Sequence, residues 1–471
     1  MVVTEAVIIA SLNWIAITTG LLFGQVAGVV NSLQKREEDI HLSESQISVI
    51  ASSMTLVCSI GFMAAATASD KIGRRWPYIF FSSTMTINWI ILYYAREMYQ
   101  FMLSRFFGGV SVGALLTLNL FVISEFTSPD TRPFFLNIVA IISPAIGTGM
   151  GHILGILMHW RNVALVGLGT AVLGAILPFF WVESPHWLAS KGRFEECQTA
   201  FRILHGETQN SERELQLLIK MEKSKLEVAK QTNCKPTLKR LAVVLKKKYF
   251  WDSILLSLFM DIYLVASGKV PFSLLGSVII EDITGSSDVF AFTTLVDGLL
   301  LLGPCLSCFF IKRTSIRTML FTTGFTANAI LIVFSACLYF SNDQSYFNWI
   351  NIGLLGLYFI IMNAGPFPLL EAIYSEMFPL ELKLYIFTIS GGILMFGFSL
   401  SVFLLPYMVR GIGYHGMFIV NALLMTISLG YIWWKLPETK GKSLQEIEMY
   451  FKTKNFDVEE VLGNEQLKAL I

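Results

Sequence analysis

The chain has 471 residues, of which 54% are hydrophobic and 15% are charged, and its mean hydropathy is +0.60. About a quarter of the residues of a water-soluble protein are charged. This composition therefore excludes an ordinary water-soluble globular protein. The net charge is +1, and the basic residues gather in short loops rather than on an extended basic and aromatic surface, which argues against a nucleic-acid partner.

Apolar segments long enough to cross a bilayer recur along the chain, each with the roughly 20 mostly apolar residues that a membrane-spanning helix needs. The first has no basic stretch before it and is long enough to span, so it is predicted to be a membrane helix and not a removable signal peptide. Twelve spans are predicted; eleven or thirteen is the alternative, because residues 365–379 are ambiguous. The twelve are 7–30, 46–68, 77–95, 99–124, 134–158, 163–182, 251–275, 289–311, 318–340, 348–370, 385–409 and 414–434.

A polar stretch divides the spans into two groups of six. The chain is therefore predicted to be an all-α membrane protein with a six-helix bundle over 1–187, a cytoplasmic helical linker over 188–250, a second bundle over 251–436 and a cytoplasmic tail over 437–471. The linker has amphipathic spacing, and the chain carries no P-loop, catalytic constellation or metal-ligand cluster. We expect no enzyme activity, no cofactor and no metal.

The loops between spans differ in charge. Every second loop is basic, including "DKIGRR" (70–75), "IKRTSIR" (311–317) and "KLPETKGK" (435–442), whereas the alternate loops, such as "EEDIHLSES" and "EDITGSSD", are acidic or neutral. By the positive-inside tendency, the basic loops and both termini are predicted to be cytoplasmic. The plasma membrane is the default location, and the oligomeric state stays open.

The two groups of six repeat the same charges. "SEFTSPDTR" (124–132) follows the fourth span and "SEMFPLELK" (375–383) follows the tenth, each with a glutamate, a proline and then a basic residue. "VESP" after the sixth span is matched by "PETK" after the twelfth. A repeat that places like charges at like helix ends predicts a transporter built from two related halves.

These segments resemble the sugar porter family of the major facilitator superfamily over almost the whole chain. The resemblance rests on "DKIGRR", "RFFGGVSVG" (105–113), "SEFTSPDTR", "VESPHWLASKGRFEEC" (182–197), "SEMFP" (375–379) and "PETKGKSLQEIE" (437–448), in the family's order. It implies a twelve-helix transporter in which charges at the inner helix ends hold the two halves together in one state. The positions that match this cytoplasmic gate are Asp70, Arg74, Arg75, Arg105, Glu125, Arg132, Glu183, Glu376, Lys383 and Glu438.

The alternative for these charges is that they only set topology, but that explains arginine and lysine and not the acids at matched helix ends. Because gate pairs form in one state and separate in the other, their combined strength sets the balance between states.

The expected ligand site departs from the family. The fifth span has no glutamine, the seventh lacks the paired glutamines and the asparagine, and the tenth lacks the tryptophan after its Gly-Pro step. Charges stand there instead, at Asp261, Lys269, Asp297 and Glu371. We expect Lys269 to pair with Asp297, which leaves Asp261 and Glu371 without an intramembrane cation. Further polar candidates that face a cavity, or else bond a neighbouring helix, are Gln25, Asn119 and Asn363.

Glu371 has two interpretations. Either it faces the central cavity, where it contacts substrate or a proton, or it is protonated and bonds a carbonyl freed by Pro366 or Pro368. Proline-broken helices at mid-membrane mark binding sites in many transporters, which favours the first interpretation.

The first span bears on coupling, because proton-driven family members resemble "FGYD" there and this chain reads "FGQVAG" (23–28). With no acid in residues 6–30, facilitated diffusion is predicted unless Glu371 or Asp261 carries the proton. The predicted function is alternating-access transport of a hexose-like sugar or polyol within a lipid bilayer. The alternatives are a transporter of a cationic or zwitterionic metabolite and a membrane sugar sensor that does not transport.

Overall fold

The structure is a computed structural model that describes most of the chain. The described residues are 3–35, 40–127, 132–209, 211–212, 215–216, 218–220, 222–223, 248–285, 289–310, 314–340, 345–376, 383–438 and 450. Every regular element in these ranges is helical. The elements are α1 (Val3–Gln34), α2 (Glu44–Ile72), α3 (Arg75–Tyr94), α4 (Met98–Phe126), α5 (Arg132–Asn137), η2 (Ile138–Ile142), α6 (Ser143–Leu157), α7 (Trp160–Ile176), η3 (Leu177–Phe180), α8 (Pro185–Ser190), α9 (Phe194–His205), α12 (Lys248–Ala266), α13 (Lys269–Thr284), α14 (Val289–Phe310), α15 (Ile316–Phe340), α16 (Ser345–Ala364), α17 (Pro366–Glu376) and α18 (Lys383–Lys435).

These helices account for the predicted spans and confirm the all-α membrane fold. Ten segments of the described residues are long and apolar enough to cross a membrane, and α3 covers a further predicted span. The last segment contains two spans: α18 has 53 residues, and Gly413 within it has a φ of +70°. A straight helix of that length would measure about 80 Å, far beyond a hydrocarbon core of about 30 Å. The ambiguous stretch around 365 is resolved, because α16 and α17 share one candidate span, Phe347–Glu371.

The helices group into two compact units. Unit 1 comprises Met1–Lys235, Val270–Leu301 and Phe398–Tyr407, and unit 2 comprises Pro236–Lys269, Leu302–Gly397 and Met408–Ile471. The grouping follows packing, so α13 and the first part of α14 belong with the first six membrane helices. The domain boundaries drawn from the sequence stay a prediction.

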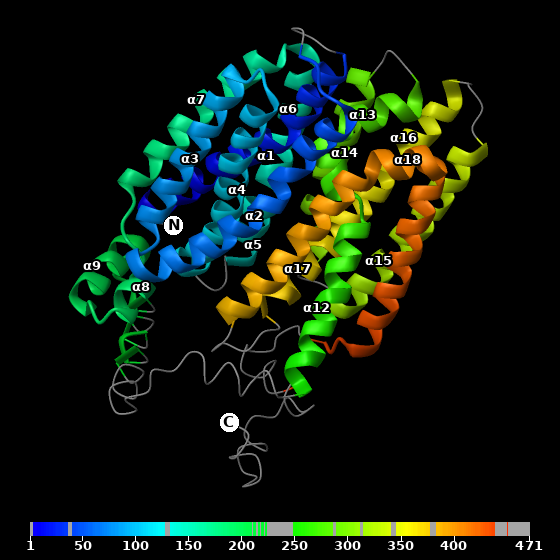
Figure 1. Cartoon of the computed structure of the whole chain (residues 1–471). Helices are drawn as coiled ribbons and strands as arrows, with labels where there is room; N and C mark the ends of the chain where they lie inside the picture. The colour runs from blue at the N-terminus through cyan, green and yellow to red at the C-terminus, as the bar shows by residue number, and fades with distance from the viewer. Residues whose placement is uncertain are drawn as a thin grey trace. The chain divides into compact units, whose positions relative to one another are not determined.

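Unit 1 is held by close contacts between helix backbones. α1 packs along α6, and α2 packs along α4 (Figure 1). At the α1–α6 contact, a Cβ added to Gly147 would overlap the carbonyl of Ile17, and one added to Gly20 would overlap the carbonyl of Pro144. Small residues that let backbones meet are the usual means of packing helices in lipid, where no hydrophobic driving force acts between them.

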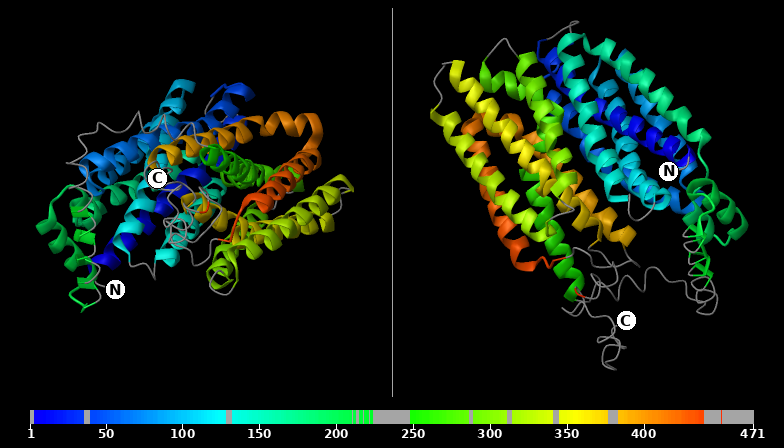
Figure 2. Two further views of the ribbon diagram at one scale, coloured as in Figure 1. Left: turned by 90° about the horizontal axis from the view of Figure 1, so that it is seen from below. Right: turned by 180° about the vertical axis from the view of Figure 1, so that it is seen from behind.

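Unit 2 pairs α15 with α16, which lie side by side in Figure 2. α16 ends at Ala364 and α17 starts at Pro366, so the chain turns slightly where Gly365 fits against Thr323. The proline that follows Lys269 also has a visible effect: Pro271 has no N–H for the carbonyl of Ser267, and the Tyr358 hydroxyl donates to that carbonyl at 2.8 Å.

The predicted linker is helical where the structure describes it. α8 and α9 enclose a small apolar core that includes Trp187, Leu188, Cys197 and Phe201. The amphipathic stretch that contains α9 is thus confirmed as a helix with one buried face. Most of residues 210–247, and nearly all of the predicted tail, lie outside the described residues.

Candidate functional site

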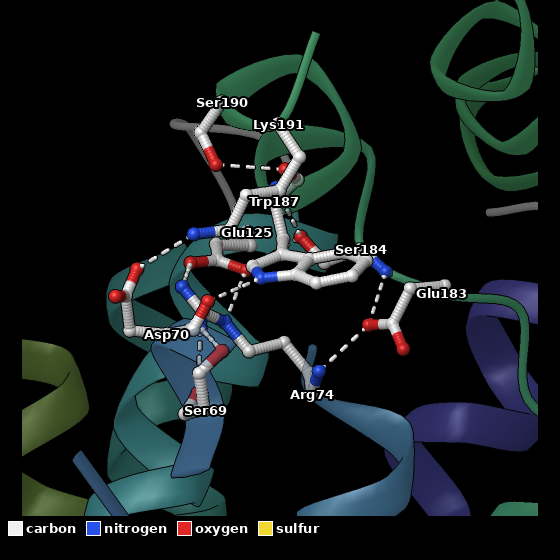
Figure 3. Close-up of polar contacts among 9 residues, drawn as sticks. All are labelled: Ser69, Asp70, Arg74, Glu125, Glu183, Ser184, Trp187, Ser190 and Lys191. Atoms are coloured by element: carbon white, nitrogen blue, oxygen red, sulfur yellow. Dashed lines mark hydrogen bonds and ion pairs between the residues drawn. The ribbon is translucent and has the colours of Figure 1, made fainter. Parts of the chain in front are cut away.

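A partly buried ion pair joins α3 to α4 in the first half. Arg74 directly precedes α3, and its guanidinium binds both carboxylate oxygens of Glu125 near the end of α4, with Nε–Oε2 at 2.9 Å and Nη2–Oε1 at 2.6 Å (Figure 3). The two side chains are only 15% and 13% exposed. Two parallel charge-assisted hydrogen bonds in a partly dry setting fix both side chains in one geometry.

Glu183 caps the start of α3. Its Oε1 accepts from the backbone N–H groups of Arg74 at 2.7 Å and Ser184 at 2.9 Å, and its Oε2 accepts from that of Arg75 at 3.4 Å. A carboxylate is favourable there because the first N–H groups of a helix have no partner within it. Gly73 makes room: its φ is +96°, and a Cβ on it would overlap the Glu183 carboxylate.

Neighbouring groups extend this cluster to α2 and α8. Asp70 accepts from Lys191 Nζ at 3.2 Å, and its backbone carbonyl accepts from the Trp187 indole at 2.9 Å. The Ser184 hydroxyl donates to Glu125 at 2.5 Å. Of these residues the sequence predicted Asp70, Glu125 and Glu183 but missed Ser184, Trp187 and Lys191, whose motif "VESPHWLASK" was noted only for its family resemblance. We call this set of residues, drawn in Figure 3, the first charge cluster.

The second half repeats the cap. Glu438 follows α18 and accepts from the Ser315 hydroxyl and, at 3.2 Å, from the backbone N–H of Arg317 at the start of α15. Even the arginine contacts agree: Arg75 donates to the carbonyl of Phe179 at 2.5 Å, and Arg317 to that of Trp433 at 2.8 Å.

When the loop before α15 is aligned with the loop before α3, the two halves differ at two positions. With Arg317 matching Arg75, Ile316 stands where the first half has Arg74, and Ser315 stands where it has Gly73. The missing glycine in "IKRTSIR" is thus replaced by a hydroxyl that binds the capping glutamate. Side chains of the remaining predicted gate residues, Arg132, Glu376 and Lys383, lie outside the described residues.

Arg105 does not belong to this cluster, which corrects the predicted grouping. It lies 20 residues before Glu125 on the same helix, about 30 Å along the axis at 1.5 Å per residue. The side chain is fully buried, and none of its guanidinium nitrogens has a hydrogen-bond partner among the described residues. Arg105 does match the family motif in sequence. It lies near the start of α4, however, whereas Glu125 and the first charge cluster lie at the other end of that helix.

Three residues of unit 2 form a group: Lys269, the first residue of α13, and Phe367 and Glu371 of α17. Lys269 Nζ lies 3.4 Å from the centroid of the Phe367 ring, which is cation–π geometry. Glu371, one helical turn further along α17, interacts electrostatically with Lys269 and is exposed. This corrects two predictions, because Lys269 is not held by Asp297 and Glu371 does have a cation nearby.

Asp297 instead meets a histidine that the sequence analysis did not select. Its Oδ2 lies 2.9 Å from Nδ1 of His152 on α6, and Nε2 of that ring lies 3.2 Å from the carbonyl oxygen of Ser273 on α13. Both side chains are buried. A lone histidine in an otherwise apolar span was the available signal, since ionisable residues are rare within membrane helices.

The other candidates are buried polar groups. Asp261 on α12 accepts weakly from Ser390 at 3.5 Å, and its Oδ1 has no partner among the described residues. Asn119 accepts from the Tyr78 hydroxyl, so it bonds a neighbouring helix. Gln25 and Asn363 each donate to a carbonyl of their own helix, at 3.4 Å and 2.9 Å, and each has an unpartnered carbonyl oxygen within the described part of the chain.

Comparison with known proteins decides the family. The family model described as "Sugar (and other) transporter" matches residues 9–451. The chain belongs to this family. Among curated relatives of this transporter, Sugar transporter ERD6-like 6 of Arabidopsis thaliana is 24% identical over 91% of the chain and 88% of its own length. Facilitated trehalose transporter Tret1 of Apis mellifera ligustica is 24% identical over 85% of the chain and 79% of its own length.

Solved structures show the same fold. The proton:xylose symporter XylE bound to 6-bromo-6-deoxy-D-glucose matches the transporter with a TM-score of 0.74, at 17% identity, over 94% of this chain and 99% of that one. The inward-open conformation of XylE from E. coli matches with a TM-score of 0.72, at 16% identity and the same coverage. The major facilitator fold expected from the sequence is confirmed.

Proposed function

We propose that this transporter carries a hexose-like sugar or a polyol across its membrane by alternating access. The observation that carries the mechanism is the repeated cap, in which Glu183 and Glu438 bind the start of the third helix of their own half. Because each half is held together by the same kind of contact, the two halves are suited to move as rigid bodies around a site near the membrane midplane. The substrate class is supported by the family and by relatives named as sugar and trehalose transporters.

The charge clusters are proposed as the cytoplasmic gate of a protein with both termini inside the cell and the plasma membrane as its location. Support comes from the basic loops, which gather at the helix ends that hold the clusters. The contacts that the structure describes tie helices within a half, so each cluster keeps its end of the bundle rigid. Asp70 and Lys191 are the exposed charged members, with side chains 70% and 36% exposed, and are open to further partners.

The proposed substrate site includes Lys269, Phe367 and Glu371. A sugar needs polar donors and acceptors beside a flat apolar face. Here the ammonium and the carboxylate supply the polar groups and the Phe367 ring supplies the face. Because the two charges offset each other, the site favours a neutral, hydroxyl-rich ligand.

A transporter of a cationic metabolite is the second candidate, and one observation favours it. Asp261 is 3% exposed and has an oxygen without a donor in the described part of the chain. An amine would supply that donor. Inhibition of uptake by amines and not by sugars would support this candidate.

Neutralising one member of the substrate site is expected to lower transport strongly. In proteoliposomes, Glu371→Gln and Lys269→Gln should each reduce saturable glucose uptake at least tenfold, because each removes one of the two charged groups that orient the ligand in the proposed site. The double variant should recover part of the loss. Lys435→Gln is the matched control, since Lys435 also lies over an aromatic ring, that of Trp434, at 4.5 Å but at the end of α18.

The same assay tests the function itself. Saturable glucose flux that an inward proton gradient leaves unchanged supports facilitated diffusion, whereas accumulation driven by the gradient would replace it with symport. Binding of glucose, seen as thermal stabilisation, without any flux would identify a sensor. Equal uptake by the control and both single variants would remove Lys269 and Glu371 from the site.

A further inference from the structure

We propose that His152 and Asp297 form a proton-binding site, which holds one proton more when the two side chains are in contact than when they are apart. The proposal rests on alternating access as proposed above, but not on the identity of the substrate. It concerns a pair that the charge clusters and the substrate site do not use. Its consequence is a transporter whose conformational balance depends on pH.

Hydrogen-bond chemistry sets the number of protons. Nδ1 of His152 faces a carboxylate oxygen at 2.9 Å and Nε2 faces a backbone carbonyl oxygen at 3.2 Å. A neutral imidazole has one N–H, so beside an ionised Asp297 it satisfies only one of these acceptors. One added proton completes both bonds, either as imidazolium and aspartate or as neutral imidazole and a protonated carboxyl group.

Burial strengthens this preference. His152 is 1% exposed and Asp297 8%, so the ionised acid beside a neutral ring would leave a net negative charge out of water. With the extra proton the pair is neutral overall. The ring is also held by its surroundings: it meets Phe272 edge-on with centroids 6.2 Å apart, and a Cβ on Gly276 would come within 2.8 Å of its Cε1.

In the described parts of α6 and α14, no other charged residue lies within one helical turn of His152 or Asp297 along the chain. Gln25 of α1, whose backbone nitrogen lies 2.8 Å from a Cβ built on Gly151, is neutral. The titratable and charged residues of the packed helices lie at least one turn away along the chain: they are Glu5 of α1, Arg161 of α7, Lys269, Glu281 and Asp282 of α13, and Cys305 and Cys308 of α14.

The contact joins the two halves of the sequence. α6 belongs to the first six membrane helices, whereas α13 and α14 belong to the second six, and the three residues involved, His152, Ser273 and Asp297, all lie in unit 1. Both residues lie toward the end of the bundle opposite the charge clusters: His152 is near the end of α6, and Asp297 is in the first half of α14. Alternating access has to open and close a contact of this kind.

The direction of the pH effect follows from linkage. When the contact opens, water supplies donors and acceptors to both side chains, so the extra proton is no longer needed to complete the hydrogen bonds. The closed contact therefore binds more protons than the open one, and its population falls as pH rises. The proton enters and leaves at the same face, so it adjusts the rate without being carried across.

The decisive experiment needs no substrate. Hydrogen–deuterium exchange of the α6 and α14 peptides is compared between wild-type protein and Asp297→Asn from pH 5.5 to 8, so that the intrinsic pH dependence of exchange cancels. An asparagine amide donates to the Nδ1 lone pair of neutral His152, so the variant closes without an extra proton. The ratio of wild-type to variant exchange should rise with pH, by up to about tenfold per unit for one linked proton.

A second variant and a matched control make the result specific. His152→Gln removes the titratable ring itself and should likewise flatten the pH dependence. Ser399→Ala breaks another contact between the sequence halves in unit 1, from the Ser399 hydroxyl to the carbonyl of Ser52 at 2.9 Å, without removing a titratable group. It should raise exchange equally at every pH.

Transport gives an independent result when glucose is carried: uptake should rise with external pH in wild type and stay level in Asp297→Asn. A constant exchange ratio between wild type and Asp297→Asn across the pH range would overturn the proton site. Absence of glucose flux would count against the proposed substrate and leave the exchange result standing.

Discussion

Replacing Arg74 or Glu125 by alanine is expected to destabilise the transporter by roughly 3–5 kcal/mol and to abolish uptake, because each change leaves the other partner of a buried pair uncompensated. Arg74 has the greater set of contacts, since its Nη1 also donates to the carbonyl and the hydroxyl of Ser69, at 2.7 Å and 2.6 Å. Removing both partners together should cost less than the sum of the single changes, because the double variant buries no lone charge. Thermal unfolding in detergent, followed for all three variants, measures this coupling.

The matched control for that experiment is an ion pair on the surface. Arg193 binds Glu196 one turn along α9 with the same bidentate geometry, at 2.7 Å and 2.5 Å, but the two side chains are 48% and 58% exposed. Such pairs contribute about 0–1 kcal/mol, so Arg193→Ala should leave the unfolding temperature and uptake nearly unchanged. If Arg74→Ala is no more harmful than Arg193→Ala, the first charge cluster is not what holds α3 to α4.

Gly73→Ala is expected to destabilise the first charge cluster strongly. Alanine in a left-handed backbone conformation costs about 1–2 kcal/mol. The new methyl group would also displace the Glu183 carboxylate, which accepts hydrogen bonds from three backbone N–H groups, and each of these bonds contributes about 1 kcal/mol. We expect a loss of roughly 3–5 kcal/mol by these two effects together and little remaining transport.

A second glycine provides the control for Gly73. Gly353 lies inside α16, has no positive φ, and has nothing within 4 Å of a built Cβ. Gly353→Ala should be neutral or stabilise the helix by up to about 1 kcal/mol. Wild-type unfolding temperature and uptake in Gly73→Ala would show that Glu183 can cap α3 from another position, and the structural account of the glycine would then be wrong.

The two halves are tied in different ways at their matched ends. In the first half, Glu183 caps α3 and Arg74 binds Glu125; in the second, Glu438 caps α15 and Ile316 stands where an arginine would bind Glu376. The first half therefore has an ion pair that the matched position of the second half does not offer. We expect the first half to be the more rigid body of the two at this end.

The sequence by itself determined the membrane-spanning segments and most of the charge cluster of the first half. Twelve apolar stretches of sufficient length leave no other structure in lipid, because every backbone group of a span must bond within its helix. The repeated motifs likewise singled out Glu125, Glu183 and Glu438, since like sequence at like helix ends produces like local contacts. The depth of Arg105 could also have been read from the sequence, by counting along a helix whose direction was known.

Only the tertiary structure decided the partners of the intramembrane charges. Asp297 and His152 are 145 residues apart, and Lys269 meets the Phe367 ring on another helix, so neither pairing has a local sequence signal. The predicted pair of Lys269 and Asp297 followed from their similar depth alone. Which face of a helix a residue occupies depends on how helices rotate against one another, and in α12 and α13 the break at Gly268, with a φ of +72°, resets that rotation. The depth of a residue in the membrane follows from counting residues along its helix. The neighbour that its side chain contacts depends on how the helices pack.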